Sequence, residues 1–186
     1  YDTARLRFPT IDGKEVTFEA ADKAVAAAMG GNVVVVSSTI TSPTSKEVIA
    51  QFLAKYPGSK HVTYDAVSYS ALIEANAATN GVAAIPDYHF ENAKAIVSLG
   101  ADFLGTWLSP VAFSKQYATG KKINEKNPTM SKHIHFESVA SLTGSNADEK
   151  YLHRPSETGA IAAALLSAVT GGSVNGIADA TLKAGI

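Results

Sequence analysis

Short apolar runs alternate along this chain with segments whose apolar residues recur at helical spacing. The first run, residues 32–37, contains four successive valines. β-Branched residues without polar alternation predict a strand that is buried on both faces, as in a parallel sheet. Further strands are predicted at residues 60–64, 94–99 and 133–136.

A predicted helix follows each of these strands. The first helix starts at Ser42 and Pro43, because a capping serine and a proline at the first helical position both favour a helix start. Its apolar positions recur until Pro57 and Gly58, which end the pattern. The other helices are predicted at residues 68–79, 110–117 and 156–169.

This alternation predicts an α/β fold with a doubly wound, mainly parallel sheet of about four strands and helices on both faces. We expect one domain over residues 1–186, with residues 1–18 and 172–186 as peripheral segments. Ligands of such sheets bind at the carboxyl ends of the strands. Here those ends are residues 37–41, 65–68, 100–107 and 137–143.

Composition narrows the function classes. Hydrophobic residues make up 46% of the 186 residues and charged residues 18%, which is enough apolar material for a core. Sixteen basic and seventeen acidic side chains nearly cancel, so no overall field favours nucleic acid or a membrane surface. The absence of cysteine excludes disulfides, cysteine-ligated zinc or iron–sulfur sites and thiol nucleophiles within these residues.

No apolar run approaches the roughly 18 residues of a membrane-spanning helix, so direct membrane insertion is not expected. The sequence starts at Tyr1 without an initiator methionine or a secretory signal. This start predicts a processed product, or a piece of a larger protein.

The hydroxyl-rich loop after the first strand, which begins at Ser37, has two interpretations. Such a loop can hold phosphates through backbone N–H groups, or it can simply cap the following helix. Helix capping is the preferred interpretation, because these residues commonly cap helices. Neither GxGxxG after the first strand nor GxxxxGK[ST] anywhere is present, which disfavours a standard dinucleotide or P-loop site.

His133, His135 and Glu137 share one face of the predicted strand and could reach one metal ion. No further ligand is evident nearby in the sequence. A solvated or hydrogen-bonded strand face is therefore the preferred interpretation.

Residues 100–107 (GADFLGTW) form the most unusual loop. Gly100 would permit close approach of a ligand, and Asp102 could accept hydrogen bonds from it. Equally, the loop could be a tight turn in which Phe103 and Trp107 cover the sheet. The ligand interpretation predicts that Asp102→Ala leaves the fold intact.

This loop belongs to a longer stretch that resembles the molybdopterin oxidoreductase (DMSO reductase) superfamily. More narrowly, it is similar to the large iron–sulfur subunit of alternative complex III, a bacterial quinol:cytochrome c oxidoreductase. The resemblance covers most of the chain. The segments that carry it are PDYHF at 86–90, AIVSLGADFL at 95–104, WLSPV at 107–111, MSKH at 130–133, FES at 136–138, LTGSNAD at 142–148 and RPSE at 154–157 with the alanine-rich segment 160–165. Near the start of the chain, RLR at 5–7, DGK at 12–14 and FEA at 18–20 are also similar.

The resemblance implies a Rossmann-like domain of a larger exported subunit. In active relatives, the loops after these strands embrace the guanine nucleotide ends of a bis-molybdopterin cofactor. Carried over residue by residue, the cofactor-binding candidates are Ser37, Gly100, Asp102, Asn146 and Asp148. Asp148 would accept hydrogen bonds from the guanine edge, a role that suits a carboxylate.

The sequence departs from active relatives at residues 64–72, where many of them supply cysteine or selenocysteine to molybdenum. Only Ser68 and Ser70 stand in this stretch, although some relatives use serine. The subunit of alternative complex III is expected to keep the fold without the molybdenum cofactor. Its iron–sulfur clusters would lie outside this cysteine-free sequence.

Three functions follow as hypotheses. The preferred one is a non-catalytic scaffold domain on the periplasmic side of a respiratory complex, in contact with other subunits and without a cofactor of its own. The second is the part of an active molybdenum oxidoreductase that binds molybdopterin guanine dinucleotide. The third is a free-standing nucleotide-binding α/β module.

Overall fold

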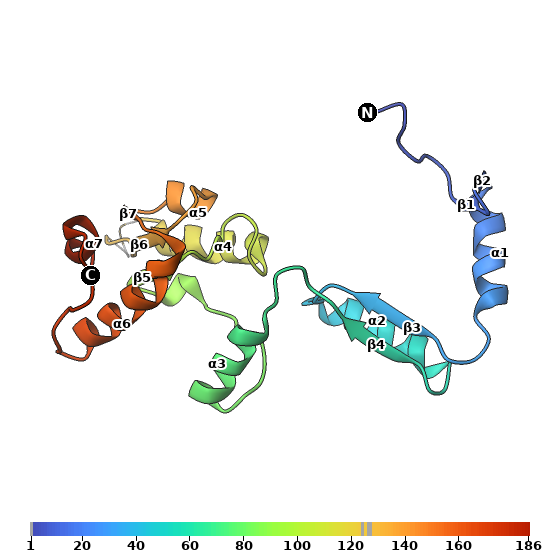
Figure 1. The fold of residues 1–186 in the computed structure, drawn as a ribbon, viewed down its shortest axis with the longest axis horizontal. Coiled ribbons are helices and arrows are strands. Elements are labelled where there is room, and N and C mark those ends of the chain that lie inside the picture. Colours follow the sequence, from blue (N-terminus) through green and yellow to red (C-terminus); the bar gives the residue numbers. More distant parts are fainter. Residues whose placement is uncertain (1, 124, 126–127) are drawn as a thin grey trace. The chain divides into compact units, whose positions relative to one another are not determined.

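The computed structural model describes residues 2–123, 125 and 128–186. The chain divides into two compact units, residues 1–85 and 86–186, which we call unit 1 and unit 2. Figure 1 shows the elements of each unit. The sequence prediction of one domain over residues 1–186 stays a prediction.

Unit 1 begins with a small hairpin, β1 (Thr10–Ile11) antiparallel to β2 (Lys14–Glu15). Asp12 and Gly13 between them have φ values of 49° and 75°, and a two-residue hairpin turn favours positive φ at both positions. Helix α1 (Phe18–Ala28) follows, and the Thr17 side chain caps it by accepting a hydrogen bond from Ala20 N. The segment 1–18 that was predicted as peripheral therefore contains a hairpin.

The rest of unit 1 is a parallel strand pair with two helices. The elements in chain order are β3 (Val34–Ser37), α2 (Pro43–Ala54), β4 (Lys60–Thr63) and α3 (Ser70–Asn80). Strands β3 and β4 pair in parallel, with Val36 opposite Val62. Ser42 caps α2 and Pro43 is its first residue, which confirms the predicted helix start. Gly81 ends α3 in the left-handed conformation.

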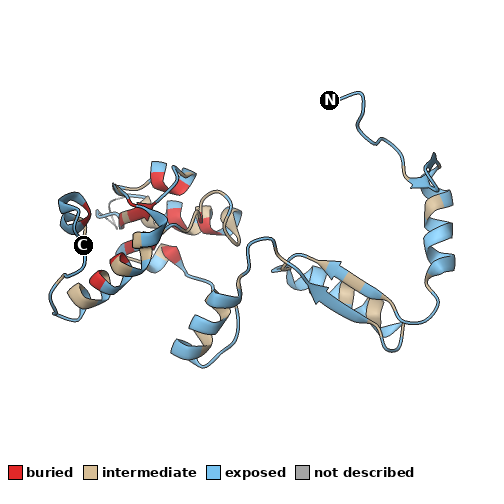
Figure 2. Ribbon diagram, viewed as in Figure 1, coloured by how far each residue is buried: buried red, intermediate tan, exposed pale blue. Residues whose placement is uncertain are grey.

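The prediction that the valine strand is buried on both faces is wrong in this structure. Val34 and Val36 are 50% and 66% exposed, while Val35, on the opposite face, is partly covered. The physical reason is that β3 pairs only with β4 in unit 1, and that α2 contacts this pair from one side. Figure 2 shows no buried residue anywhere in the described part of unit 1.

Unit 2 contains a three-stranded parallel sheet in the order β5-β6-β7. Its strands are β5 (Ala95–Leu99), β6 (Lys132–Glu137) and β7 (Glu149–Leu152). The helical elements are η1 (Phe90–Asn92), α4 (Pro110–Lys121), α5 (Leu142–Ser145), η2 (Pro155–Glu157), α6 (Thr158–Val169) and α7 (Ala180–Ala184). The α/β class and the parallel pairing predicted from the sequence are confirmed.

The central strand β6 separates two clusters of buried side chains. On one face, Ile96 of β5 joins the aromatic rings of Phe90, Phe103, Phe113 and Tyr117. On the other face, Phe136 packs with Ile161 of α6 and Leu182 of α7. Residues 172–186 were predicted to be peripheral, but Leu182 in this segment is buried in the second cluster.

All four strands predicted from the sequence are found, with ends that agree to within about two residues. Strand β7 was not predicted, because its sequence Glu-Lys-Tyr-Leu carries two charges and lacks an apolar run. Helix α4 continues four residues beyond the predicted end at Tyr117. Among the residues that the structure describes, no helix is long and apolar enough to cross a membrane.

Replacement of Ile161 tests the second cluster. Ile161 is fully buried, so Ile161→Ala removes buried methyl groups and leaves a cavity, and we expect a loss of about 2–5 kcal/mol in the free energy of unfolding. Urea unfolding followed by the fluorescence of Trp107, the single tryptophan, measures this loss in unit 2. Leu166→Ala on the exposed side of the same helix is the control, and a similar loss in both variants would contradict this account of the core.

Candidate functional site

A pocket of about 300 Å³ lies at the carboxyl ends of the unit 2 strands. The residues that line it follow β5, β6 and β7 or begin α6: Leu99, Gly100, Glu137, Ser138, Val139, Ser141, His153, Pro155 and Thr158. We call this the strand-end pocket. Its position agrees with the rule that ligands of parallel sheets bind outside the carboxyl ends of the strands.

Gly100 is the one predicted cofactor-binding residue in this pocket. Its φ of +66° lies in the left-handed region that favours glycine, and its N–H donates to Phe136 O at 2.7 Å. The turn that follows β5 therefore depends on a glycine at this position. The sequence motif identified Gly100 for a different reason, the close approach of a ligand.

Glu137 and His153 line the same pocket; the sequence suggested Glu137 only as a possible metal ligand and gave His153 no binding role. Glu137 is 2% exposed, and its Oε2 accepts hydrogen bonds from Ser141 N at 3.0 Å and Ser141 Oγ at 2.6 Å. His153 is 9% exposed, and its Nδ1 lies 2.8 Å from Arg154 O. The signal that could have found both is their position at a strand end, but β7 itself was not recognised in the sequence.

The carboxylate of Asp102 is used inside the fold. Its Oδ1 accepts from Thr143 N at 3.1 Å and Thr143 Oγ1 at 2.8 Å, and its Oδ2 accepts from Thr106 Oγ1 at 3.0 Å. Burial acts to raise the pKa of Asp102, but these hydrogen bonds outweigh it and hold the pKa below its ordinary value. A Cβ at Gly105 would collide with this carboxylate, so the turn packs tightly against Asp102 and needs a glycine at position 105.

Of the two interpretations of the loop 100–107, the structure therefore supports the tight turn. Phe103 is 1% exposed and stacks on Phe90 with ring centroids 4.4 Å apart. Trp107 packs against the same cluster. Leu104 N donates to Thr143 Oγ1 at 2.9 Å, which fastens the loop to α5.

Asn146 and Asp148 precede β7, at the amino ends of the strands and so at the opposite end of the sheet from the strand-end pocket. The Asn146 side chain donates to Leu142 O at 2.8 Å, and the backbone carbonyl of Asn146 accepts from Tyr117 Oη at 2.9 Å. Asp148 accepts from His133 N at 2.6 Å and from the Lys121 ammonium. Burial acts to raise the pKa of Asp148, but the bonds from Lys121 and His133 lower it overall.

Ser37 belongs to unit 1 and ends β3. Its Oγ donates to Ser38 O at 2.7 Å and lies 2.8 Å from His61 Nε2. The neighbouring loop is held by Asp65, which accepts from Thr39 N at 2.7 Å and from the Thr39 hydroxyl at 2.5 Å. These hydrogen bonds lower the pKa of Asp65.

The structure thus brings Gly100 to a pocket and gives the polar groups of Asp102, Asn146 and Asp148 partners within unit 2. Asp102 and Asp148 lie near opposite edges of the same sheet, so within unit 2 they do not form one site. Sequence spacing could not reveal this, because Asp148 follows α5 and precedes a strand that was not predicted.

His133, His135 and Glu137 share one face of β6, as predicted, but that face is buried and not solvated. Tyr117 Oη lies 3.1 Å from His133 Nδ1, and His135 Nε2 lies 3.2 Å from Glu137 Oε2. In the part of the chain that the structure describes, no three His, Cys, Asp or Glu side chains are placed to hold a metal ion. We call these three residues the buried polar row.

Burial governs the protonation of both histidines. It lowers the pKa of His133 to about 4, with smaller effects of His135 and Lys121 in the same direction. It also lowers the pKa of His135, although Glu137 acts in the opposite direction. Both imidazoles are therefore neutral at pH 7, and Tyr117, whose pKa is raised to about 12 chiefly by burial, keeps its proton.

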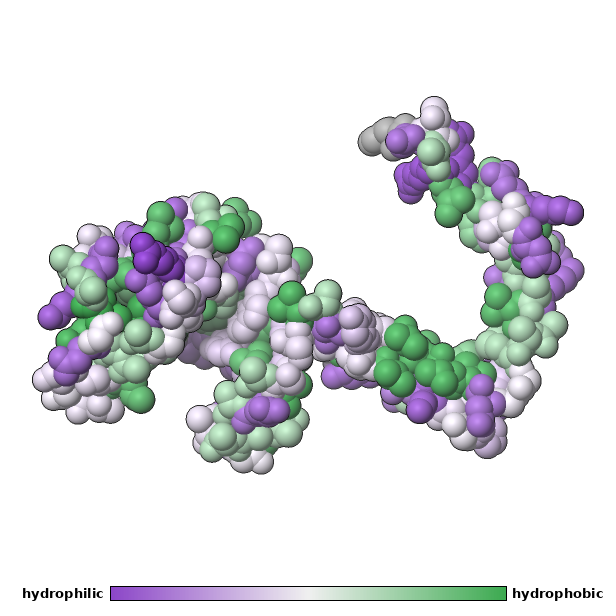
Figure 3. Space-filling model, viewed as in Figure 1, coloured by the Kyte–Doolittle hydropathy of each residue, from purple (hydrophilic) through white to green (hydrophobic). Residues whose placement is uncertain are grey.

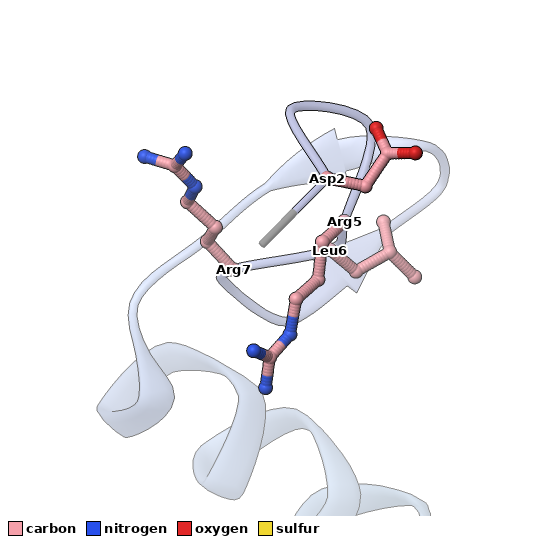
Figure 4. A pocket seen from close by; sticks show the side chains of 4 residues that line it. All are labelled: Asp2, Arg5, Leu6 and Arg7. Atoms are coloured by element: carbon pink, nitrogen blue, oxygen red, sulfur yellow. The ribbon is translucent and has the colours of Figure 1, made fainter.

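A further hollow of about 470 Å³ lies near the start of the chain. Figure 4 shows the side chains of Asp2, Arg5, Leu6 and Arg7 that line it; the two arginines point away from each other, and Asp2 and Leu6 extend to another side. All four residues are exposed. This hollow lacks the convergent polar groups that a binding site requires.

Replacement of Asp102 distinguishes a structural from a ligand-binding carboxylate. We expect Asp102→Ala to lose about 2–3 kcal/mol of stability, because Thr143 N and two hydroxyls lose their acceptor. This outcome would overturn the expectation, derived from the sequence, that the variant folds normally. Thermal melting followed by circular dichroism measures the loss; Asp22→Ala, an exposed residue of α1, is the control, and equal melting of both variants would contradict the structural role.

Acid should destabilise unit 2 through the buried polar row. A histidine with a lowered folded-state pKa binds its proton more readily when unfolded, so stability falls as the pH drops below about 6.5 and the loss is complete below the folded pKa near 4. We expect His133 to contribute up to about 3 kcal/mol to this loss. Urea midpoints measured between pH 7 and 4 check it. The decrease of the midpoint with falling pH should be smaller in His133→Asn and should persist in His89→Asn, in which an exposed histidine is replaced. An unchanged decrease in His133→Asn would contradict the assignment.

Comparison with known proteins adds no family assignment to this geometry. No family model matches the chain, and a search of curated proteins finds no significant match. What the chain does is therefore inferred from its residues, their geometry and the sequence resemblance.

Proposed function

We propose that this chain is a non-catalytic, molybdopterin-oxidoreductase-like scaffold domain in the iron–sulfur subunit of a respiratory quinol:cytochrome c oxidoreductase. The observation that carries the proposal is the use of Asp102 and Asp148 inside the fold. These are the two carboxylates that the resemblance assigns to a cofactor, and both accept hydrogen bonds from neighbouring protein groups.

A cofactor cradle needs these carboxylates free to accept hydrogen bonds from the ligand. Asp102 is bonded through both of its oxygens, to one N–H and two hydroxyls, and Asp148 accepts a backbone N–H and an ammonium group through Oδ2. Release of either group would leave buried donors without a partner, at a cost of roughly 1–3 kcal/mol for each group. The arrangement therefore favours a structural role over the alternative of a working guanine dinucleotide site.

The apolar surface of unit 1 supports a role in an assembly. Val34, Val36 and Val62 lie on one face of the β3–β4 pair and are all exposed; we call this the valine face. In Figure 3 apolar side chains gather over these strands. An exposed patch of this kind is typical of a surface that another chain or element covers.

The proposal includes the location and partners that the resemblance implies. The domain would lie on the periplasmic side of a bacterial membrane and contact other subunits of the complex. It would hold no cofactor of its own, and the iron–sulfur clusters would belong to other parts of the subunit. The lack of cysteine in this sequence supports that division of roles.

We also propose that the strands form one Rossmann-like, doubly wound sheet with helices on both faces. Two features support this finer description of the fold. All pairs among β3 to β7 are parallel, and helices connect successive strands.

Elemental and pterin analysis of the complete subunit, purified from its native membrane, tests the function. We expect iron without molybdenum and no guanine-bearing pterin. A matched measurement on the chain itself is calorimetric titration with GMP, for which we expect no heat of binding in the wild type or in Asp148→Ala. Molybdenum in the subunit, or GMP binding that Asp148→Ala abolishes, would overturn the scaffold proposal in favour of the cofactor site.

A further inference from the structure

The valine face of unit 1 requires a covering element. Val34, Val36 and Val62 are 50%, 66% and 38% exposed, whereas Val35 on the opposite face is partly covered on the side where α2 contacts the strand pair. Strands of parallel pairs are usually covered on both faces, because the crossover helices lie there. One face of the β3–β4 pair therefore has its helix, and the valine face calls for another.

Helix α3 has an unused apolar side. The helix contains no buried residue, and Ala71, Ala75 and Ala78 recur at a spacing that places them on one side of it. All three are exposed, and we call them the alanine stripe. Another side of the helix is engaged by the chain that follows, since Asn76 Nδ2 donates to Val82 O at 2.8 Å. The alanine stripe is therefore the side of α3 that is free to pack.

The valine face and the alanine stripe are complementary in size. The valine face carries branched side chains that project from the strands, and the alanine stripe carries three single methyl groups. Small side chains let a helix approach a sheet closely, and tight packing needs such alternation of large and small groups. The 11 residues of α3 span roughly 16 Å, enough to cross strands of four residues, which span roughly 13 Å.

The two surfaces are also complementary in charge. Lys60 pairs with Val34 in the strand register, so it shares the valine face and is its one charged residue. Glu74 is the only charged residue of α3, and its charge is of opposite sign. A helix that runs antiparallel to the strands also brings its carboxyl end toward Lys60 at the start of β4. That end carries partial negative charge and has no basic residue in its last turn.

The connection favours α3 over the other uncovered helix of unit 1. Only residues 64–69 join the end of β4 to the start of α3, and both elements belong to unit 1. Helix α1 also has no buried residue, but Phe18 and Val25 are bulky exposed residues of this helix. Bulky groups on α1 would meet the branched valines without the size complementarity that α3 offers.

We propose that α3 is a lid for the valine face: in the free chain its alanine stripe packs on Val34, Val36 and Val62. The packing itself concerns unit 1 alone and is independent of Asp102 and Asp148, which carry the scaffold proposal. Its consequence rests on the proposed function, because a subunit that binds the valine face in the assembly has to displace α3 first.

Engineered cysteine pairs test this packing directly, because the chain contains no cysteine of its own. The pair Val62→Cys with Ala75→Cys is compared with Val35→Cys and Ala75→Cys, in which the strand cysteine lies on the opposite face. Dilute full-length chain is oxidised, and disulfides within one chain are quantified by mass spectrometry. We expect at least about tenfold more disulfide in the first pair, since the bond forms only between closely placed residues.

A charge placed on the alanine stripe tests the same contact without a crosslink. Lysine is a good helix former, so Ala75→Lys keeps α3 helical but places an ammonium group against the valine face. We expect amide hydrogen exchange of residues 33–37 and 60–64 to become at least about tenfold faster in this variant. Asn80→Lys, on another side of the same helix, is the matched control and should exchange like the unmodified chain.

Four outcomes would overturn the inference. The first is equal disulfide formation in the two cysteine pairs. The second is a disulfide that forms only between two chains, which would assign the valine face to a second copy. The third is preferential crosslinking of Val62→Cys to Val25→Cys, which would assign the face to α1. The fourth is equal hydrogen exchange in the two lysine variants. None of these outcomes depends on the metal and pterin content of the subunit.

Discussion

The parallel pairing of β6 with a strand on each side is the constraint on which unit 2 depends. Because side chains alternate along a strand, this pairing directs His133, His135 and Glu137 to one face and Ile134 and Phe136 to the other. The second face receives α6 and α7 through ordinary apolar packing. The first face carries three titratable groups into the interior, so the elements that cover it must supply hydrogen bonds as well as apolar surface.

The covering elements meet this requirement unevenly. Tyr117 of α4 bonds to His133, and Ser141 before α5 bonds to Glu137. Gly144 is needed at this contact, since a Cβ there would collide with the Glu137 carboxylate. His135, by contrast, has only Glu137 Oε2 near its Nε2, at 3.2 Å, and its Nδ1 has no hydrogen-bond partner among the described residues. Burial of this nitrogen without a partner costs free energy, which the surrounding aromatic cluster has to offset.

The sequence predicts the regular elements of the fold far better than the partners of its polar side chains. The run 94–99 became strand β5, where local β-propensity and the burial of Ile96 and Ser98 agree, whereas 60–64 became β4 by pairing with β3 although its residues are exposed. The charged strand β7 could not be predicted from its own residues, since it forms by pairing with β6. The exposure of Val34 and Val36 also could not be predicted from the local sequence, because burial depends on which elements pack against the strand and not on its composition.

The same distinction explains the candidate site. Gly100 could be identified locally, since a glycine after a strand has few other uses. Asp102 and Asp148 look like ligand groups in the sequence because main partners of both are distant along the chain: Thr143 and His133 lie 41 and 15 residues away. Glu137 was considered in the sequence only as a metal ligand and His153 was given no role, yet each has a buried side-chain atom without a hydrogen-bond partner among the described residues. Function at such a site is therefore decided by which polar atoms the fold leaves unpaired, and these become visible only when the long-range contacts are known.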